Sequence, residues 1–223
     1  MGTGKTQKIS HIRAASIEFT YYFEGAVIHD PNHTFRITYR GCEEKIWRVA
    51  EVSSNNTLAQ LGYTILVTFD TLAYHLFSIS CKGISYELDT DEEEIDDALC
   101  LCWVKLSTLN LQIGDKLEMT YNFGCEQLFD IELTGVQDLP RGHGRAYPRI
   151  AAGEGRGIID DLPADELLKM IREIDRTGVS RFQYMTPYEK MIPWDYRNYD
   201  LEIDNALFKG DVNQVQFAYE ERE

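Results

Sequence analysis

Four arginines and a histidine crowd a glycine-rich stretch of this otherwise acidic chain, RGHGRAYPRIAAGEGRG at residues 141–157. Guanidinium groups bind phosphate and carboxylate oxygens in a fork, and glycines let backbone amides approach an anion closely. The stretch therefore predicts a site for an anion or a nucleic acid, with an aromatic ring on which a base could stack. The candidate residues are Arg141, His143, Arg145, Tyr147, Arg149 and Arg156.

The same arginines could instead stabilise the fold. In that interpretation Arg149 pairs internally with Asp160 or Asp161, while the rest of the stretch stays a solvated loop. The residue types alone leave both interpretations open.

A second charged stretch, DTDEEEIDDALC, carries seven acids between Asp89 and Asp97. A calcium-binding loop needs a glycine at its sixth position and a glutamate at its twelfth, where this stretch has Glu94 and Cys100. The pattern is typical of a solvated acidic loop. Its alternative role is an interaction surface, either for a basic protein partner or as a nucleic-acid mimic that inhibits a defence nuclease. The candidate contacts are Asp91, Glu92, Glu93 and Glu94.

Arrangements typical of catalysis or metal binding are weak. Cys125 is followed by Glu126, whose negative charge disfavours the thiolate that a nucleophile needs. Cys100 and Cys102 lack the Cys-x-x-Cys spacing of structural zinc sites, and the chain has no second pair. The opening MGTGKT has neither the earlier glycine nor the strand of a phosphate-binding loop. We therefore expect no metal and no cofactor, and a non-enzymatic protein rather than an enzyme.

The overall charge narrows the possible partners. The chain has 37 acidic residues against 22 lysines and arginines, a formal charge of −15. Because lysine and arginine supply most of the affinity for nucleic acid, only a local basic patch could bind it.

Five cysteines, no N-terminal apolar run and no membrane-length segment favour a cytoplasmic protein with reduced thiols and no membrane contact. An unidentified protein is the expected partner, and the oligomeric state is open.

Several segments alternate apolar and polar residues as half-buried strands do. They are TFRITYRG at 34–41, KIWRVAEV at 45–52, HLFSISCKGISYEL at 75–88, KLEMTYNF at 116–123 and QLFDIELTGV at 127–136. Lys82 and Gly83 predict a turn within the third segment, and Gly124 predicts the turn of a hairpin between the last two.

Three segments have helical spacing. Residues 57–70 place Leu58, Leu61, Ile65 and Phe69 on one face, and Thr57 with Gln60 forms a capping-box pattern. Residues 162–178 carry the buried stripe Leu167, Ile171 and Ile174 and end at Gly178. Residues 200–210 predict a short helix with Gly210 near its end.

This order of elements predicts an α+β fold with a mainly antiparallel sheet packed against two principal helices and a small C-terminal helix. We expect an N-terminal extension at 1–30, a single domain at 31–210 and a C-terminal tail at 211–223.

Five phrases in this order resemble the plasmid pRiA4b ORF-3-like family: FRITYRGCEEKIWRVAEV, TLAQLGYTILVTFDTLAYHLFSI, KLEMTYNFG, YPRIAAGEG and YDLEIDNAL. The resemblance implies a prokaryotic α+β domain of unknown activity, found on plasmids, transposable elements and phage-like regions. Some members carry a resolvase label, but this acidic chain shows no basic helix-turn-helix region that a serine recombinase would need.

The chain also departs from the pattern of the family it resembles. Where the family has Tyr-Asp-Phe-Gly-Asp and then a Trp and a His, this sequence has Tyr121, Asn122, Phe123, Gly124 and Cys125, then Gln127 and Phe129. Groups capable of acid-base chemistry are thus replaced in a divergent member, and we interpret the hairpin as scaffold. The alternative is an enzyme of unknown reaction with a pocket near Tyr121, Asn122, Arg149 and Asp160.

Overall fold

The computed structural model describes residues 31–88, 96–138, 148–185 and 190–220. Seven strands form one sheet in the order β4-β3-β5-β6-β1-β2-β7, and every neighbouring pair is antiparallel. The strands are β1 (Asn32–Tyr39), β2 (Trp47–Ser53), β3 (Phe77–Cys81), β4 (Ile84–Glu87), β5 (Lys116–Tyr121), β6 (Gln127–Gln137) and β7 (Arg149–Glu154). The expected antiparallel sheet is confirmed.

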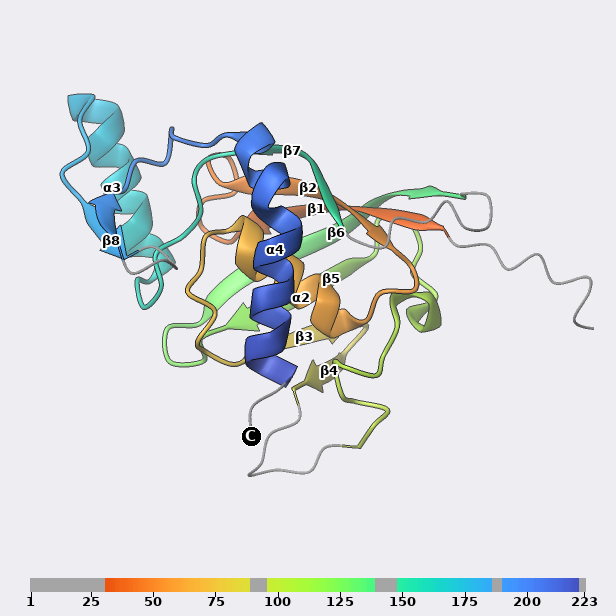
Figure 1. The fold of residues 1–223 in the computed structure, drawn as a ribbon. Helices are drawn as coiled ribbons and strands as arrows, with labels where there is room; N and C mark the ends of the chain where they lie inside the picture. The colour runs from red at the N-terminus through yellow and green to blue at the C-terminus, as the bar shows by residue number, and fades with distance from the viewer. Residues whose placement is uncertain (1–30, 89–95, 139–147, 186–189, 221–223) are drawn as a thin grey trace, which may run out of the picture.

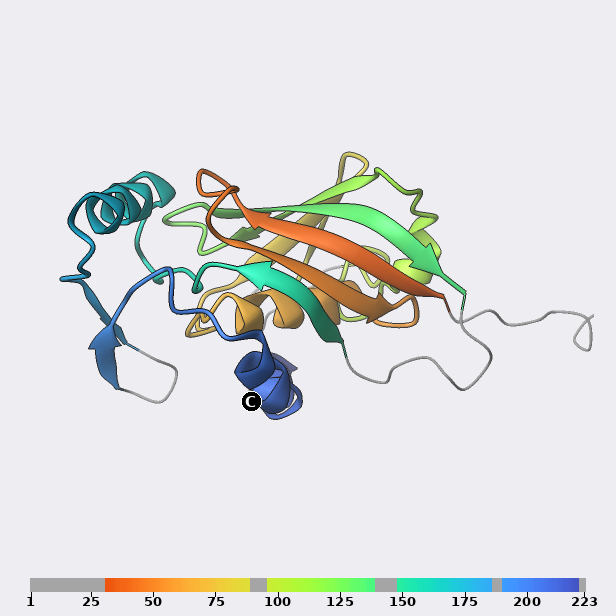
Figure 2. The same ribbon diagram turned by 90° about the horizontal axis from the view of Figure 1, so that it is seen from above.

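Helices cover one face of this sheet in two layers. Helix α2 (Leu58–Thr68) packs directly on the strands, and α4 (Leu201–Glu220) lies on the far side of α2 (Figures 1 and 2). Helix α3 (Ala164–Thr177) and a two-stranded ribbon of β8 (Gln183–Met185) and β9 (Met191–Pro193) stand beyond one end of the sheet (Figure 1). The fold is therefore α+β, as expected.

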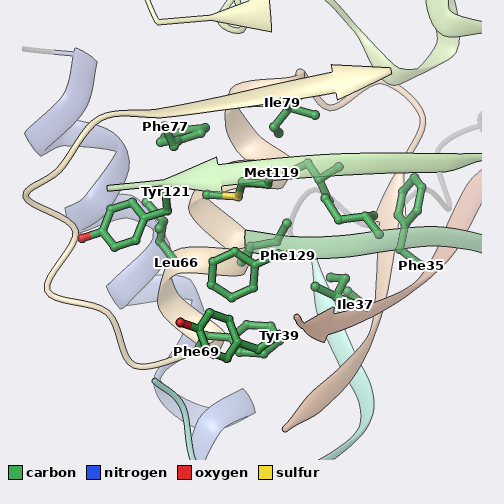
Figure 3. Packing of buried hydrophobic residues seen from close by; sticks show 14 of the residues in the cluster. Phe35, Ile37, Tyr39, Leu66, Phe69, Phe77, Ile79, Met119, Tyr121 and Phe129 are labelled. Atoms are coloured by element: carbon green, nitrogen blue, oxygen red, sulfur yellow. The ribbon is translucent and has the colours of Figure 1, made fainter. Parts of the chain in front are cut away.

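The main core lies between the sheet and α2. Phe35, Ile37 and Tyr39 alternate along β1 and have no exposed surface, while the residues between them are half-buried. Figure 3 shows these rings and aliphatic chains meeting Met119 of β5 and Phe129 of β6. The predicted hairpin of β5 and β6 is confirmed, and its apolar faces build the core.

Helix α2 begins as the capping-box pattern predicts. The Thr57 hydroxyl accepts from the Gln60 N–H at 3.2 Å, and the Gln60 side chain accepts from the Thr57 N–H at 3.0 Å. The helix is nevertheless buried on almost every side, because α4 covers the face that the sheet leaves open. Tyr63 of α2, for example, stacks on Tyr219 of α4 with ring centroids 5.5 Å apart.

The C-terminal helix is longer than expected. Residues 200–210 were predicted to form a short helix ending near Gly210, but α4 has 20 residues and continues through this glycine to Glu220. Phe208 and Val212 are buried on either side of Gly210, so packing on α2 offsets the low helix propensity of the glycine. In the ranges that the structure describes, no helix is both long and apolar enough to span a membrane.

Two predicted glycine positions adopt the left-handed backbone that other residues avoid. Gly178 has φ of 74° and its N–H donates to the Ile174 carbonyl at 2.8 Å, which ends α3. Lys82 and Gly83 have φ of 50° and 81° and form the turn between β3 and β4.

Candidate functional site

The structure places two of the six candidate anion-binding residues, and they lie apart. Arg149 begins β7 and pairs with Glu51 of β2, Nη1 to Oε2 at 3.8 Å, on the face of the sheet away from α2. Arg156 follows the other end of β7 and pairs with Asp70, Nε to Oδ2 at 3.5 Å, beside α4. The expected alternative pairing of Arg149 with Asp160 or Asp161 is wrong, because Arg149 faces Glu51 across the strand pair.

The remaining candidates fall outside the described residues. They are Arg141, His143, Arg145 and Tyr147 of the basic stretch and Asp91, Glu92, Glu93 and Glu94 of the acidic stretch. The hypotheses that rest on them remain predictions.

A polar network lies where β5 ends, at part of the alternative pocket named from the sequence. The Tyr121 hydroxyl donates to Asp160 Oδ2 at 3.0 Å, and the Leu72 N–H donates to the same oxygen at 2.9 Å. Asp160 Oδ1 is buried without a hydrogen-bond partner. Burial raises the pKa of Asp160, and these two donors counteract part of the effect.

The neighbouring Asp161 binds three side chains. Its carboxylate accepts from the Tyr74 hydroxyl, from the Asn122 amide at 2.7 Å and from His75, whose Nε2 lies 2.8 Å from Oδ1. The Tyr74 hydrogen bond is the largest of the effects that lower the pKa of Asp161. With Asp161 ionised, its carboxylate can only accept, so His75 Nε2 carries the proton of this contact.

This network brings together Tyr121, Asn122 and Asp160 as the sequence suggested, but not Arg149. Tyr74 and His75 take its place, and the Cys125 thiol lies 3.5 Å from the Asp161 carbonyl rather than beside a base. Within the described ranges, no group of three His, Cys, Asp or Glu side chains could hold a metal ion. These contacts hold the loop after α2 against the turn of the β5–β6 hairpin. The network therefore stabilises the fold.

A cavity of about 300 Å³ opens between α2 and α4, and we name it the α2–α4 cavity. Its walls are the end of α2, the loop of residues 70–73, Arg156, Tyr184 of β8 and one side of α4. Val67, Leu72, Leu207, Phe208 and Val215 supply apolar surface. The cavity therefore sits where the second helical layer meets the first.

The charged groups of the cavity are mostly acidic. Asp70, Asp204 and Asp211 line it together with the single cation Arg156. Burial is the main cause that raises the pKa of Asp204 to about 6, and the Asp70 carboxylate raises it further. Arg48 and Arg156 oppose this shift without cancelling it.

Arg48 is a fully buried cation behind the lining of the α2–α4 cavity. It occupies an inward position of β2, and its guanidinium lies 3.8 Å from the centroid of the Tyr199 ring. Nε donates to the Thr68 carbonyl at 3.0 Å, and Nη1 donates to the Trp47 and Glu154 carbonyls at 2.9 Å each. Nη2 has no hydrogen-bond partner, and burial lowers the pKa of the guanidinium.

The sequence interpretation missed the α2–α4 cavity and His75. One signal was available: in Ile46, Arg48, Ala50 and Val52 the arginine occupies the inward position of an alternating strand. A charge at such a position indicates a buried polar site, because burying it without partners is costly. Half of the α4 residues that line the cavity lie beyond the segment expected to be helical, namely Asp211, Gln214, Val215 and Ala218.

Comparisons with known proteins place the fold in a wider group. A model of the family described as plasmid pRiA4b ORF-3-like protein matches residues 32–206. The chain is also similar to the crystal structure of a protein of unknown function from Methanosarcina mazei Go1, with a TM-score of 0.61 and 18% sequence identity. That likeness covers 78% of this chain and 97% of the other, and at this identity it shows a shared fold. Comparison with curated proteins gave no match.

Proposed function

This chain belongs to the plasmid pRiA4b ORF-3-like protein family, and we propose that it is a non-enzymatic binding protein whose ligand occupies the α2–α4 cavity. The observation that supports the proposal is the composition of the cavity walls. Apolar side chains of α2 and α4 face a small set of charged groups, the combination that binds small ligands and orients them.

The size of the cavity fits this role. Its volume of about 300 Å³ lies at the lower end of the range for small-molecule sites. Ile203 and Leu207 line the cavity with more than half of their surface exposed, at 59% and 54%. A ligand would cover apolar surface that the fold leaves in contact with water.

The proposal can be tested with small fragments and nuclear magnetic resonance. Short alkyl amines, carboxylates and alcohols are titrated into the isotope-labelled protein at millimolar concentration, and amide shifts are mapped. We expect the shifts to gather on the loop of residues 70–73 and on the cavity side of α4.

Two variants of neighbouring α4 residues separate the cavity from the rest of the surface. Gln214 lines the cavity, while Asn213 is exposed and does not. Gln214→Trp should fill the opening and remove the fragment shifts, and Asn213→Trp should retain them. The proposal would be contradicted if no fragment shifts the amide signals of the cavity residues in the wild type. It would also be contradicted if the fragments bind both variants equally.

Arg149 supports a second candidate function, binding of an anion or nucleic acid by the basic stretch. Its side chain is 48% exposed, and its ion pair with Glu51 is long at 3.8 Å. A guanidinium held this loosely is available for a phosphate. In the sequence, Arg149 closely follows the candidates at 141–147. A shared anion site requires these residues to lie on the same face of the sheet as Arg149.

Retention on immobilised single-stranded DNA tests this second function. Arg145→Ala with Arg149→Ala should abolish retention with little change in melting temperature. Arg172→Ala with Arg176→Ala, at two exposed positions of α3, removes the same number of charges and should retain binding. Equal retention by all three proteins would exclude the basic stretch, and a large fall in melting temperature would assign its arginines to structural ion pairs.

A further inference from the structure

Asp204 is an acid of the α2–α4 cavity that forms no ion pair in the described part of the chain. It lies in the first turn of α4, half-buried, and faces groups from every element around it. These groups are Asp70 from the loop after α2, Arg48 from β2, Arg156 from the segment after β7 and Tyr199 from the segment before α4.

Within the described residues, neither of the two nearby guanidinium groups is bonded to Asp204, although Arg48 Nη2 and Arg156 Nε are buried without hydrogen-bond partners. Arg48 uses Nε and Nη1 on the Thr68, Trp47 and Glu154 carbonyls, and Arg156 lies 3.5 Å from Asp70. In the described part of the chain neither forms an ion pair with Asp204. The carboxyl therefore remains in a partly dry site without a direct cation, which is costly for its ionised form.

The surroundings of Asp204 on α4 are apolar. Ile203 and Leu207 line the cavity and are largely exposed, and Phe208 is buried at its inner side. An acid beside exposed aliphatic surface in an open cavity matches a ligand with a positive head and a short hydrocarbon chain.

We propose that the α2–α4 cavity binds a small aliphatic amine, with its ammonium group between Asp204 and Asp70 and its carbon chain against Leu207 and Phe208. This inference rests on the proposed function and names its class of ligand. Three carboxylates against one arginine in the lining disfavour an anionic ligand of the same size. The limited volume disfavours a folded protein segment as the occupant.

Binding should be linked to the ionisation of Asp204. An ammonium group favours the carboxylate over the carboxyl, so binding releases a proton whenever Asp204 is protonated in the free protein. Because the pKa of Asp204 is raised to about 6, affinity should increase as the pH rises towards neutrality and then level off. Asp70, Asp211, Arg48, Arg156, Tyr184 and Tyr199 are the other ionisable groups around the cavity in the described residues, and they set the affinity at this plateau.

Calorimetric titration with three probes of one chain length tests the inference. Pentylammonium should bind, pentanoate should not, and pentanol should bind more weakly than the amine. Asp204→Asn should weaken binding of pentylammonium by about tenfold or more and remove its pH dependence between about pH 5 and pH 7. Asp165→Asn, an exposed acid of α3, is the matched control and should bind like the wild type.

The outcomes separate this inference from the broader proposal. If pentanoate or pentanol binds as well as the amine and Gln214→Trp removes that binding, the cavity is a ligand site but not one for amines. If Asp204→Asn binds the amine with unchanged affinity and pH dependence, the assignment of Asp204 is wrong. If none of the probes binds the cavity, both the amine and the proposed function fail. If a lysine-containing peptide binds this site far more tightly than pentylammonium, the natural ligand is a lysine side chain of a protein partner and not a small amine.

Discussion

The Tyr121 hydroxyl and Asp160 Oδ2, 39 positions apart in the chain, are joined by a hydrogen bond of 3.0 Å. The bond connects the end of β5 to the segment that precedes α3. Since the Leu72 N–H donates to the same oxygen, Asp160 also holds the loop after α2. One side chain thus joins three segments around the edge of the core.

Tyr121→Phe should lower the free energy of unfolding by about 1–2 kcal/mol at neutral pH. The substitution removes one of two donors to a largely buried carboxylate and leaves the ring in place. The loss of unfolding free energy should be smaller in acid, because a hydrogen bond to a protonated Asp160 is weaker than one to its carboxylate. Urea unfolding at several pH values measures both effects.

Tyr86→Phe on β4 is the control for this prediction. Its ring is also buried, at 7% exposure, and its hydroxyl makes no hydrogen bond within the described residues. We expect little change in stability. Equal losses in the two variants would mean that the Asp160 hydrogen bond contributes nothing specific.

The strands could be predicted because their signals are local. Phe35, Ile37 and Tyr39 alternate with polar neighbours, and Gly83 is the residue type that the positive φ of the turn after β3 favours. Thr57 and Gln60 likewise fix the start of α2 without help from the rest of the chain.

The site depends on contacts that no local pattern contains. Arg149 was expected to pair with Asp160 or Asp161, yet the register of β2 and β7 places it opposite Glu51. His75 meets Asp161 across 86 positions, and a loop histidine gives no indication of such a partner. Gly210 indicated a helix end, and only packing between α2 and α4 overrides it.

Asp204→Asn should make the protein more stable near neutral pH. The unfolded chain loses this proton near the ordinary value of 3.8, whereas the folded chain keeps it up to about 6. Between these values unfolding releases a proton, so the stability of the wild type falls as the pH rises and is level above the folded pKa. Below the unfolded pKa both states are protonated and the variant gains nothing.

The gain should be roughly 1 kcal/mol, since Asp204 is only half-buried and solvent screens part of the effect. Thermal unfolding at about pH 4 and about pH 7 measures it. Loss of amine binding in the same variant would show that the acid is kept for binding at some expense of stability. A variant less stable than the wild type at both pH values would contradict the raised pKa.

Gly155→Ala should prevent stable folding, with a loss greater than about 3 kcal/mol. Gly155 has φ of 75°, and an added Cβ would lie 1.9 Å from the Lys45 carbonyl oxygen. Gly114→Ala is the control, because its φ is 95° but nothing lies within 4 Å of the added carbon. That variant should lose only about 1–2 kcal/mol from the backbone strain. Equal losses measured by urea unfolding would show that the contact with Lys45 is relieved by a shift of the chain.

Gly210→Ala should stabilise the protein by up to about 1 kcal/mol, since alanine restricts the unfolded chain and favours the helix. The added carbon has open space, with nothing within 4 Å, and Gly210 lies between the buried Phe208 and Val212 of α4. Circular dichroism and urea unfolding measure helix content and stability. Asn213→Ala, at an exposed position of the same helix, sets the gain expected from helix propensity alone, and Gly210→Ala should exceed it. A loss of stability would mean that α4 bends or ends at Gly210, and the outer wall of the α2–α4 cavity would then not be a continuous helix.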